Sequence, residues 1–570
     1  MCGIVGFTGR ENALPILIKG LYSLEYRGYD SAGVAAFTKD GLRVVKARGR
    51  IANLEEKIKE EGGDMYCTCG IGHTRWATHG EPSDRNSHPH LGGKGKVAVV
   101  HNGIIENYKE LRERLEAHGY EFKSETDTET VAHLVDYLHT GKQEDLAKTV
   151  LQAVQRLRGS YALGVVSMDN TQEIVAARRG NPLVIGIGEG ENMIASDITA
   201  IINRTKRYII LDDNEVAIVR PDSVVVMNEF GDTVEKEIMT VTWDMSAAEK
   251  GGYQHIYAQG DHGADPRQLP IRLSRVSKND AVAFEDNGLT DERLREIEHI
   301  HIIGCGSALH AGMVGKRVIE AMCRIRCTAE VASEFRYENP IIGKKDMCIV
   351  ISQSGETADT LAAMRLAKQA GAFTIAIVNV VSSTIAREAD GVLYTWAGPE
   401  ISVATTKAYS AQLSALYLIS VKIARVRGLI SIGDERALCA ELQRLPECIE
   451  QTLGCQSDMQ RIATLYANRS SVFFLGRGLD YAAALEASLK LKEISYIHSE
   501  AYAAGELKHG TISLIEEGTL VVALATQPAL FEKPVSNIRE GCSARRKRRA
   551  RHHGRFHRGT SRSASHRAPA

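Results

Sequence analysis

Short apolar runs alternate with longer helical stretches after about residue 295, and this alternation constrains the fold more than any other feature. Strands joined through helices form parallel sheets, because a parallel connection must return to the same end of the sheet. We therefore expect an α/β architecture here, with strands at 299–303, 347–351 and 373–378.

The arrangement repeats weakly later in the chain. The run 472–475 leads into Gly476-Arg477-Gly478, as 299–303 leads into Gly304-Cys305-Gly306, and a helical stretch follows both. A repeated supersecondary pattern predicts two related units. We place them at 290–430 and 465–540, joined by a helical connector over 431–464.

The first part of the chain has a different pattern. β-type runs such as 97–100, 163–166 and 183–186 are separated by glycine and polar turns, and helical patterns occupy about 104–117 and 128–139. This predicts an α+β domain with antiparallel sheets. We expect the domain over residues 2–220, and the more polar residues 221–290 as its end and a linker.

Composition indicates a soluble globular protein, with 44% hydrophobic and 25% charged residues, and the cysteine usage points to the cytoplasm. There is no apolar run of the length that crosses a membrane, and the start lacks a signal-peptide pattern. Eleven cysteines are scattered, and Cys67-Thr68-Cys69 is too closely spaced for the usual zinc pattern. Unpaired thiols fit a reducing compartment.

Cys2 follows the initiator Met1 directly. Removal of Met1 would give Cys2 a free α-amine beside its own thiol, so that one residue supplies both a base and a nucleophile. An α-amine titrates near pKa ~7.7–8.0, so part of it is unprotonated at neutral pH. Taken alone, Cys2 is better explained as a small residue at a buried chain start.

Three polar clusters follow, at 72–80, 101–107 and 124–129. Arg75 can hold a carboxylate through two hydrogen bonds, and Asp127 can hold an ammonium group. The Asn102 side chain and the Gly103 N–H can stabilise a tetrahedral oxyanion. Each has an ordinary alternative, since Arg75 suits a surface ion pair and Asn102-Gly103 suits a hairpin turn.

Together with Cys2-Gly3-Ile4-Val5-Gly6 and the segment 25–33, these clusters resemble the class II glutamine amidotransferases. The resemblance implies a four-layer N-terminal nucleophile fold. It also implies hydrolysis of L-glutamine to glutamate and ammonia through a thioester on Cys2. The glutamine-binding residues it implies are Arg75, Trp76, Thr78, His79, Asn102, Gly103 and Asp127.

Ser352-Gln353-Ser354-Gly355-Glu356-Thr357 follows an apolar strand and opens a helix. Hydroxyl groups and free N–H groups at a helix N-terminus form an anion site, although a plain capped helix has the same residues. The loop has no lysine, so it is not a nucleotide P-loop.

Further on, Glu493 and His509 suit the proton transfer and ring opening of an aldose–ketose isomerase, although a lone glutamate on a helix is commonly solvent-exposed.

The second half resembles two sugar isomerase (SIS) domains, and residues 1 to about 530 together resemble the amidotransferases that form amino sugars. That resemblance implies transfer of ammonia to fructose 6-phosphate with isomerisation, giving glucosamine 6-phosphate. Glu493 would move the proton between C1 and C2, with Lys490 assisting and His509 opening the ring. The sugar-phosphate residues it implies are Ser307, Ser352, Gln353, Ser354, Thr357, Val403 and Thr405.

The same resemblance implies no metal and no organic cofactor. It implies a homodimer formed by the isomerase half, and an internal ammonia channel gated by Trp76. We expect no membrane and no nucleic-acid partner.

Two segments depart from the family pattern. Residues 256–284 look like a local shift of reading frame, restored from about 285. Residues 541–570 contain nine Arg, one Lys and no acid, a charge of +10 that leaves −11 on the rest, and we expect them to be disordered.

The departure after 540 would leave the second SIS unit incomplete, with an unpaired sheet edge. We expect reduced stability and impaired amination from this loss. The alternatives are a glutaminase-only or inactive chain, or a phosphosugar-binding regulator. No helix-turn-helix supports the regulator.

Overall fold

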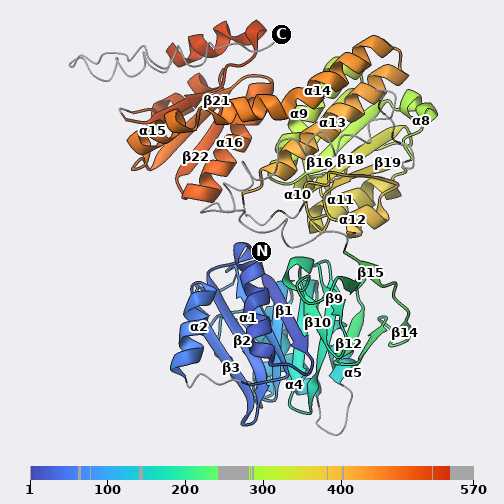
Figure 1. Ribbon diagram of the computed structural model, residues 1–570, viewed down its shortest axis with the longest axis vertical. Helices are drawn as coiled ribbons and strands as arrows, with labels where there is room; N and C mark the ends of the chain where they lie inside the picture. Colours follow the sequence, from blue (N-terminus) through green and yellow to red (C-terminus); the bar gives the residue numbers. More distant parts are fainter. Residues whose placement is uncertain are drawn as a thin grey trace. The chain divides into compact units, whose positions relative to one another are not determined.

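The computed structural model describes residues 2–61, 66–77, 79–139, 146–241, 282, 284, 288–381, 383–398, 400, 404–516 and 518–539. They fall into two compact units, one up to residue 241 and one from residue 282 (Figure 1). The expected departures at 256–284 (except 282 and 284) and 541–570 lie outside these residues. In the described ranges, no helix combines the length and hydropathy needed to span a membrane.

Two antiparallel sheets form the first unit, as the glycine-punctuated strand pattern predicted. The larger one has the order β15-β11-β9-β10-β1-β4-β2-β3 within the described residues. Its strands are β1 Gly3–Thr8, β2 Ser31–Thr38, β3 Gly41–Arg48, β4 Cys69–Arg75, β9 Val184–Ile187, β10 Asn192–Ala195, β11 Arg207–Ile210 and β15 Met239–Thr240. The second sheet, ordered β14-β13-β12-β8-β7-β6-β5, contains β5 His90–Leu91, β6 Val97–Ile105, β7 Gly159–Ser167, β8 Asn170–Arg179, β12 Val216–Arg220, β13 Ser223–Met227 and β14 Thr233–Val234.

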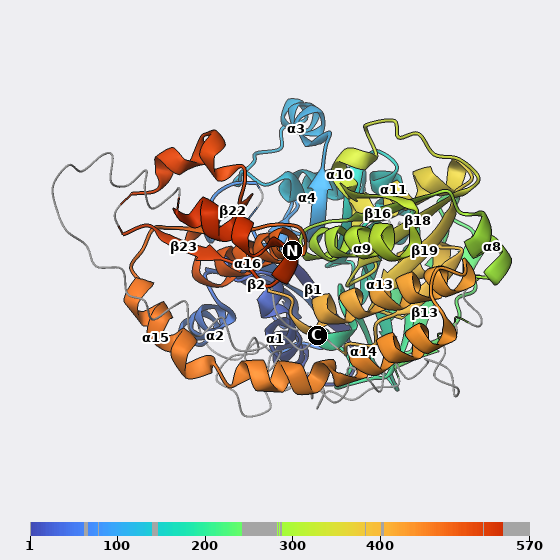
Figure 2. The same ribbon diagram turned by 90° about the horizontal axis from the view of Figure 1, so that it is seen from above.

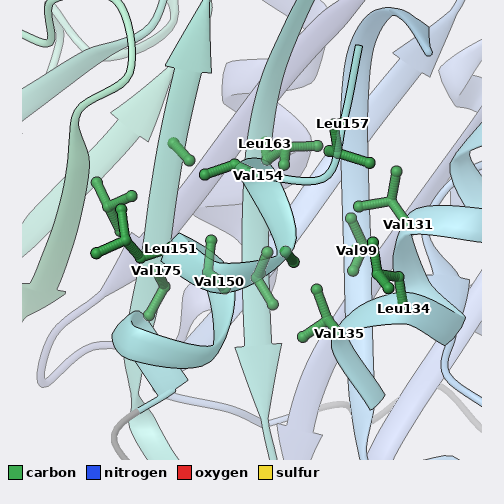
Figure 3. Packing of buried hydrophobic residues seen from close by; sticks show 14 of the residues in the cluster. Val99, Val131, Leu134, Val135, Val150, Leu151, Val154, Leu157, Leu163 and Val175 are labelled. Atoms are coloured by element: carbon green, nitrogen blue, oxygen red, sulfur yellow. The ribbon is translucent and has the colours of Figure 1, made fainter. Parts of the chain in front are cut away.

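Helices cover the outer face of each sheet, so the unit has the four layers that the resemblance implied. The helices are α1 Ala13–Leu24, α2 Ile51–Glu60, α3 Tyr108–Ala117, α4 Asp127–Leu138 and α5 Leu146–Val154. Side chains alternate along strand β6 between the two layers. Val97 and Val99 belong to the core formed with α4 and α5, where Figure 3 shows Val99 beside Val131 and Val135 of α4. Ala98 and Val100 pack on the other sheet.

The expected helix over 104–117 was wrong at its start. Residues Ile104 and Ile105 continue β6, and the helix begins at Tyr108. The pairing of Ile105 with Gly159 on β7 extends the strand, because ladder hydrogen bonds outweigh a local helical pattern. The start of α4 was placed within one residue, and the Thr126 side chain accepts a capping hydrogen bond from the Glu129 N–H.

The second unit begins with a parallel sheet in the order β17-β16-β18-β19-β20. Apolar residues alternate sides along its strands. Ile349 packs on α9 and α13, whereas Val350 packs on α11 and α12. Both faces are therefore covered, which explains the uninterrupted apolar runs (Figure 2 shows α9 and α13 side by side). The elements are α8 Asp291–Glu296, β16 His299–Gly304, α9 Ser307–Cys323, β17 Arg326–Val331, α10 Ala332–Phe335, β18 Asp346–Ser352, α11 Ala358–Gln369, β19 Phe373–Val378, α12 Thr384–Glu388, β20 Gly391–Tyr394 and α13 Lys407–Val426.

A second copy of this arrangement follows the helical connector, α14 Ile432–Leu453 and α15 Gln456–Tyr466. It consists of β21 Ser471–Gly476, α16 Leu479–Ser495, β22 His498–Ala503 and β23 Leu520–Ala523, with the sheet order β22-β21-β23. Helices α9 and α16 both have 17 residues and both follow a glycine of nearly identical backbone angles, Gly306 and Gly478. In the described residues β23 pairs only with β21, and the expected loss of stability stays a prediction.

Candidate active sites

Strand alternation gathers the first candidate site between the two sheets of the first unit. Ile4 on β1 and Ile71 on β4 face the second sheet, and Val100 on β6 faces the first. Residues two positions away in an extended chain keep the same orientation. Cys2 lies two positions before Ile4, whereas His73 and Asn102 lie two positions after Ile71 and Val100. Cys2, His73 and Asn102 therefore meet at one end of the inter-sheet layer.

The contacts confirm this placement. Asn102 Nδ2 donates to the carbonyl oxygen of Cys2 over 3.1 Å. His73 Nε2 lies 3.0 Å from both Asn102 Oδ1 and the His101 carbonyl oxygen. Both of these atoms accept hydrogen bonds, so Nε2 carries the proton. The bond from His73 fixes the carboxamide with its NH₂ group towards Cys2.

Burial sets the protonation states of the His73 ring and the Cys2 thiol. It lowers the pKa of His73 to about 3, so the ring is a neutral donor at physiological pH. It also raises the pKa of the Cys2 thiol, although the Trp76 N–H, 3.3 Å from Sγ, acts in the opposite direction. The thiol is therefore mostly protonated at neutral pH and needs a base to become a nucleophile.

Arg75 and Asp127 lie close enough to Cys2 for their charges to act on its thiol. Arg75 is buried, and its Nη2 donates to the carbonyl oxygens of His79 and Gly80, whereas its Nη1 is a buried donor without a partner among the described residues. Asp127 accepts the Ile105 N–H over 2.9 Å and occupies the first turn of α4, where a carboxylate is also favoured by the helix dipole.

The other glutamine-binding candidates are spread around this group. Gly103 has φ +129°, and a Cβ there would overlap the Ser160 carbonyl oxygen, so only glycine fits. The Trp76 ring is partly exposed and packs edge-on against Tyr29. His79 packs edge-on against Tyr108, and Thr78 lies outside the described residues.

The second candidate site lies at the carboxyl ends of β16 and β18. The strand order places β16 and β18 side by side at the point where the chain reverses its direction of winding, which is where open α/β sheets bind ligands. Ser307 follows β16, and the Ser352–Thr357 loop follows β18. The Ser352 hydroxyl accepts the Gly355 N–H over 3.0 Å and contacts the Thr357 hydroxyl at 2.9 Å.

Gly355 shapes this loop. It has φ +65°, and a Cβ there would overlap the hydroxyl of Ser383. The corresponding loop after β23 differs in chemistry, because its Thr526 hydroxyl donates to Asp480 over 2.5 Å. In the first copy the hydroxyls of Ser352, Ser354 and Thr357 instead form hydrogen bonds within the loop, where Ser354 accepts the Glu356 N–H over 3.2 Å. Gln353 lies in the same loop.

A buried carboxylate joins Ser307 to the catalytic candidates on α16. Glu486 accepts hydrogen bonds from the Ser307 hydroxyl and from His310 Nδ1, both over 2.7 Å. Lys490 Nζ lies 3.4 Å from Glu486 and 2.5 Å from Glu493. Lys490 and Glu493 therefore lie side by side on α16, and the catalytic roles that the resemblance implies for them stay predictions.

The start of α13 lies beside the same network. Burial raises the pKa of Tyr409, and the negative charge of Glu486 adds to this. Thr405, just before α13, donates to Glu400 over 2.9 Å, and Val403 lies outside the described residues. His509 is exposed, and in the described part of the chain its side chain forms no hydrogen bond or ion pair with Glu493.

The sequence analysis missed three polar residues of these sites. His73 stood within a motif, but its contact with Asn102 depends on the pairing of distant strands. Glu486 precedes Lys490 by four residues, which on a helix indicates an ion pair and could have been noticed. His310 had no local signal.

Comparison with known proteins agrees with this division of the chain. Residues 73–203 match the model of a glutamine amidotransferase domain, and residues 293–422 and 465–537 match the SIS domain. The glutamine–fructose-6-phosphate aminotransferase [isomerizing] of Clostridium tetani is 52% identical over 540 residues, covering 95% of this chain and 88% of the relative. Its counterpart from Caldanaerobacter subterraneus subsp. tengcongensis is 53% identical with the same coverage.

A solved structure is similar to the second unit. The C-terminal domain of the Francisella tularensis glucosamine-fructose-6-phosphate aminotransferase is 34% identical, with a TM-score of 0.50 over 52% of this chain and 82% of that domain. Identity of about half over nearly the whole chain shows the family. The chain belongs to the isomerising glutamine–fructose-6-phosphate aminotransferases, with an amidotransferase domain followed by two SIS domains.

Proposed function

We propose that this chain transfers ammonia from L-glutamine to D-fructose 6-phosphate, giving L-glutamate and D-glucosamine 6-phosphate. The observation that carries the proposal is the Asn102 carboxamide, locked by His73 with its Nδ2 3.1 Å from the Cys2 carbonyl oxygen. A buried thiol beside an oriented amide donor is the arrangement that acyl transfer requires.

In the glutaminase step, loss of Met1 frees the α-amine of Cys2, which takes the thiol proton. The thiolate attacks the side-chain amide carbon of glutamine, and Asn102 with the Gly103 N–H stabilises the oxyanion. The C–N bond breaks, ammonia leaves with the transferred proton, and water hydrolyses the thioester to glutamate. The unpartnered Nη1 of Arg75 supports a role in holding the substrate carboxylate.

In the synthase step, the Ser352–Thr357 loop and Ser307 hold the sugar phosphate. Ammonia condenses with the C2 carbonyl of the open sugar, and water leaves. Glu493 then moves a proton from C1 to C2 of the resulting imine, while Lys490, 2.5 Å away, stabilises the charged carboxylate. His509 is assigned to ring opening, where its exposed imidazole can exchange protons with solvent.

We further propose a cytoplasmic homodimer formed by the isomerase half. Support comes from Ile494 and Tyr496 at the end of α16, which are 50% and 72% exposed. The described cysteines are not joined by disulfide bonds, which fits a reducing compartment. Light scattering of the purified chain measures the mass directly.

The test separates the two half-reactions with two variants. Cys2→Ala should abolish glutamate release from glutamine. Glu493→Gln should leave glutamate release intact and abolish glucosamine 6-phosphate formation, measured by product analysis. Mass spectrometry of the N-terminus should show that Met1 is absent. Unchanged glutamate release by Cys2→Ala would refute the glutaminase assignment. Glutamate release without amino-sugar formation in the parent chain would leave it a glutaminase alone.

A further inference from the structure

A second group of polar side chains lies at the opposite end of the first parallel sheet from the sugar-phosphate loop. His299 and His301 stand at the start of β16, and Asp346 begins β18 in register with His299. Alternation places the two histidines on one face of the sheet. Ser352 closes the same strand β18, roughly 20 Å away at the usual rise per residue.

Two imidazole nitrogens and one carboxylate oxygen lie close together here. The candidate ligand atoms of His299, His301 and Asp346 all lie within 4.8 Å of one another. The rings of the two histidines are 4.1 Å apart between centroids. Asp346 Oδ2 accepts the Gly343 N–H over 2.7 Å, which fixes the orientation of its carboxylate.

His301 has the contacts of a metal ligand held in place by its neighbours. Its Nδ1 lies 3.1 Å from the Thr328 hydroxyl and 3.4 Å from Glu330 Oε1. A carboxylate in contact with Nδ1 places the proton there and leaves a lone pair on Nε2, as is common for histidines that bind metals.

That lone pair has no partner among the described residues. His301 is only 4% exposed, yet its Nε2 forms no hydrogen bond and lies 3.7 Å from Asp346 Oδ2, which is itself an acceptor. His299 Nε2 is also buried and without a hydrogen bond. Buried polar atoms are rarely left unsatisfied. A cation between them would satisfy all three groups at once.

Two basic residues next to this group, Arg326 and Lys345, do not supply that cation. Arg326 is level with His299 on β17, and it forms no ion pair with Asp346 among the described residues. Lys345 pairs instead with Glu298.

We propose that His299, His301 and Asp346 bind a divalent transition metal, for which Zn²⁺ is the best match. Two imidazoles with one carboxylate suit zinc, whereas Mg²⁺ and Ca²⁺ prefer oxygen ligands alone. The family resemblance implied no metal, and the sequence analysis did not single out His299 or His301.

The test uses the full chain after dialysis against a chelator. Calorimetric titration with ZnCl₂ and thermal melting with and without zinc are compared for the parent chain, His299→Gln, His301→Gln and Asp346→Asn. We expect each variant to bind one zinc ion fewer per chain than the parent. We also expect zinc to raise the melting temperature of the parent but not of these variants. Glu330→Gln should weaken the affinity by about 10- to 100-fold.

The matched control is His498→Gln, which alters the exposed first residue of β22 in the second copy and should bind zinc like the parent. If buried His301→Gln does not fold, the half-exposed His299→Gln and Asp346→Asn decide the result. Equal zinc stoichiometry and affinity in these two variants and in the parent would overturn the proposal.

Discussion

Replacement of Glu486 should loosen the packing of α9 against α16. Its carboxylate accepts two hydrogen bonds of 2.7 Å, from Ser307 and His310, and lies 3.4 Å from Lys490. Hydrogen bonds to charged groups contribute ~1.5–3 kcal/mol each, and removal of one partner from a buried ion pair costs ~3–5 kcal/mol. Glu486→Ala should therefore lower the local free energy of unfolding by about 3–5 kcal/mol.

Amide hydrogen exchange of the full chain measures this change by segment. A loss of that size corresponds to exchange in α9 and α16 that is roughly a hundred- to several-thousand-fold faster, at tenfold per ~1.4 kcal/mol. Amides of β6 and β7 in the first unit serve as an internal reference. The control variant is Glu441→Ala, which removes an exposed ion pair with Arg444 and should cost about 0–1 kcal/mol.

The pH dependence gives a second check. Burial raises the pKa of Glu486, but His310, Lys490 and Ser307 outweigh it and hold the pKa below its ordinary 4.5. A depressed pKa stabilises the fold above the unfolded value, and the contribution is lost as pH falls through the folded value. The difference between the parent and Glu486→Gln should shrink below pH 4.5. If Glu486→Ala exchanges like Glu441→Ala, the reasoning is wrong.

Three further outcomes follow from the sites. Because burial raises the pKa of Cys2 above its ordinary 9.0, its alkylation by iodoacetamide should keep rising beyond pH 9.0, and a midpoint at or below pH 9.0 measured by mass spectrometry would contradict this. His73→Leu should lower glutaminase kcat by up to about 100-fold with little change in KM, because Asn102 loses its orientation. His73→Gln keeps a hydrogen-bond donor and should restore part of the rate. Equal kcat in the two variants would exclude a positioning role for His73. Gly355→Ala should raise the KM for fructose 6-phosphate by about tenfold or more, since it strains a loop at positive φ, while glutamate release measured without sugar stays at the parent level.

Much of this architecture could be predicted because it depends on short-range periodicity. Alternation in residues 97–100 places one set of side chains towards helices and the other towards a sheet, and the unbroken run 347–351 indicates a strand covered on both faces. The Ser352 loop could also be located, because ligand sites in such sheets lie at the carboxyl ends of strands.

The error at residues 104–105 had the opposite origin, since pairing with β7 extended a strand through a locally helical pattern. Helix and strand periods are properties of neighbouring residues, so the sequence alone determined the elements, their buried faces and the loops that carry Cys2 and Ser352. Tertiary structure alone decided that His73 supports Asn102, that Glu486 connects α9 with α16, and that His301 faces Asp346. Those contacts depend on strand register and helix packing between segments far apart in the chain, and no local pattern encodes them.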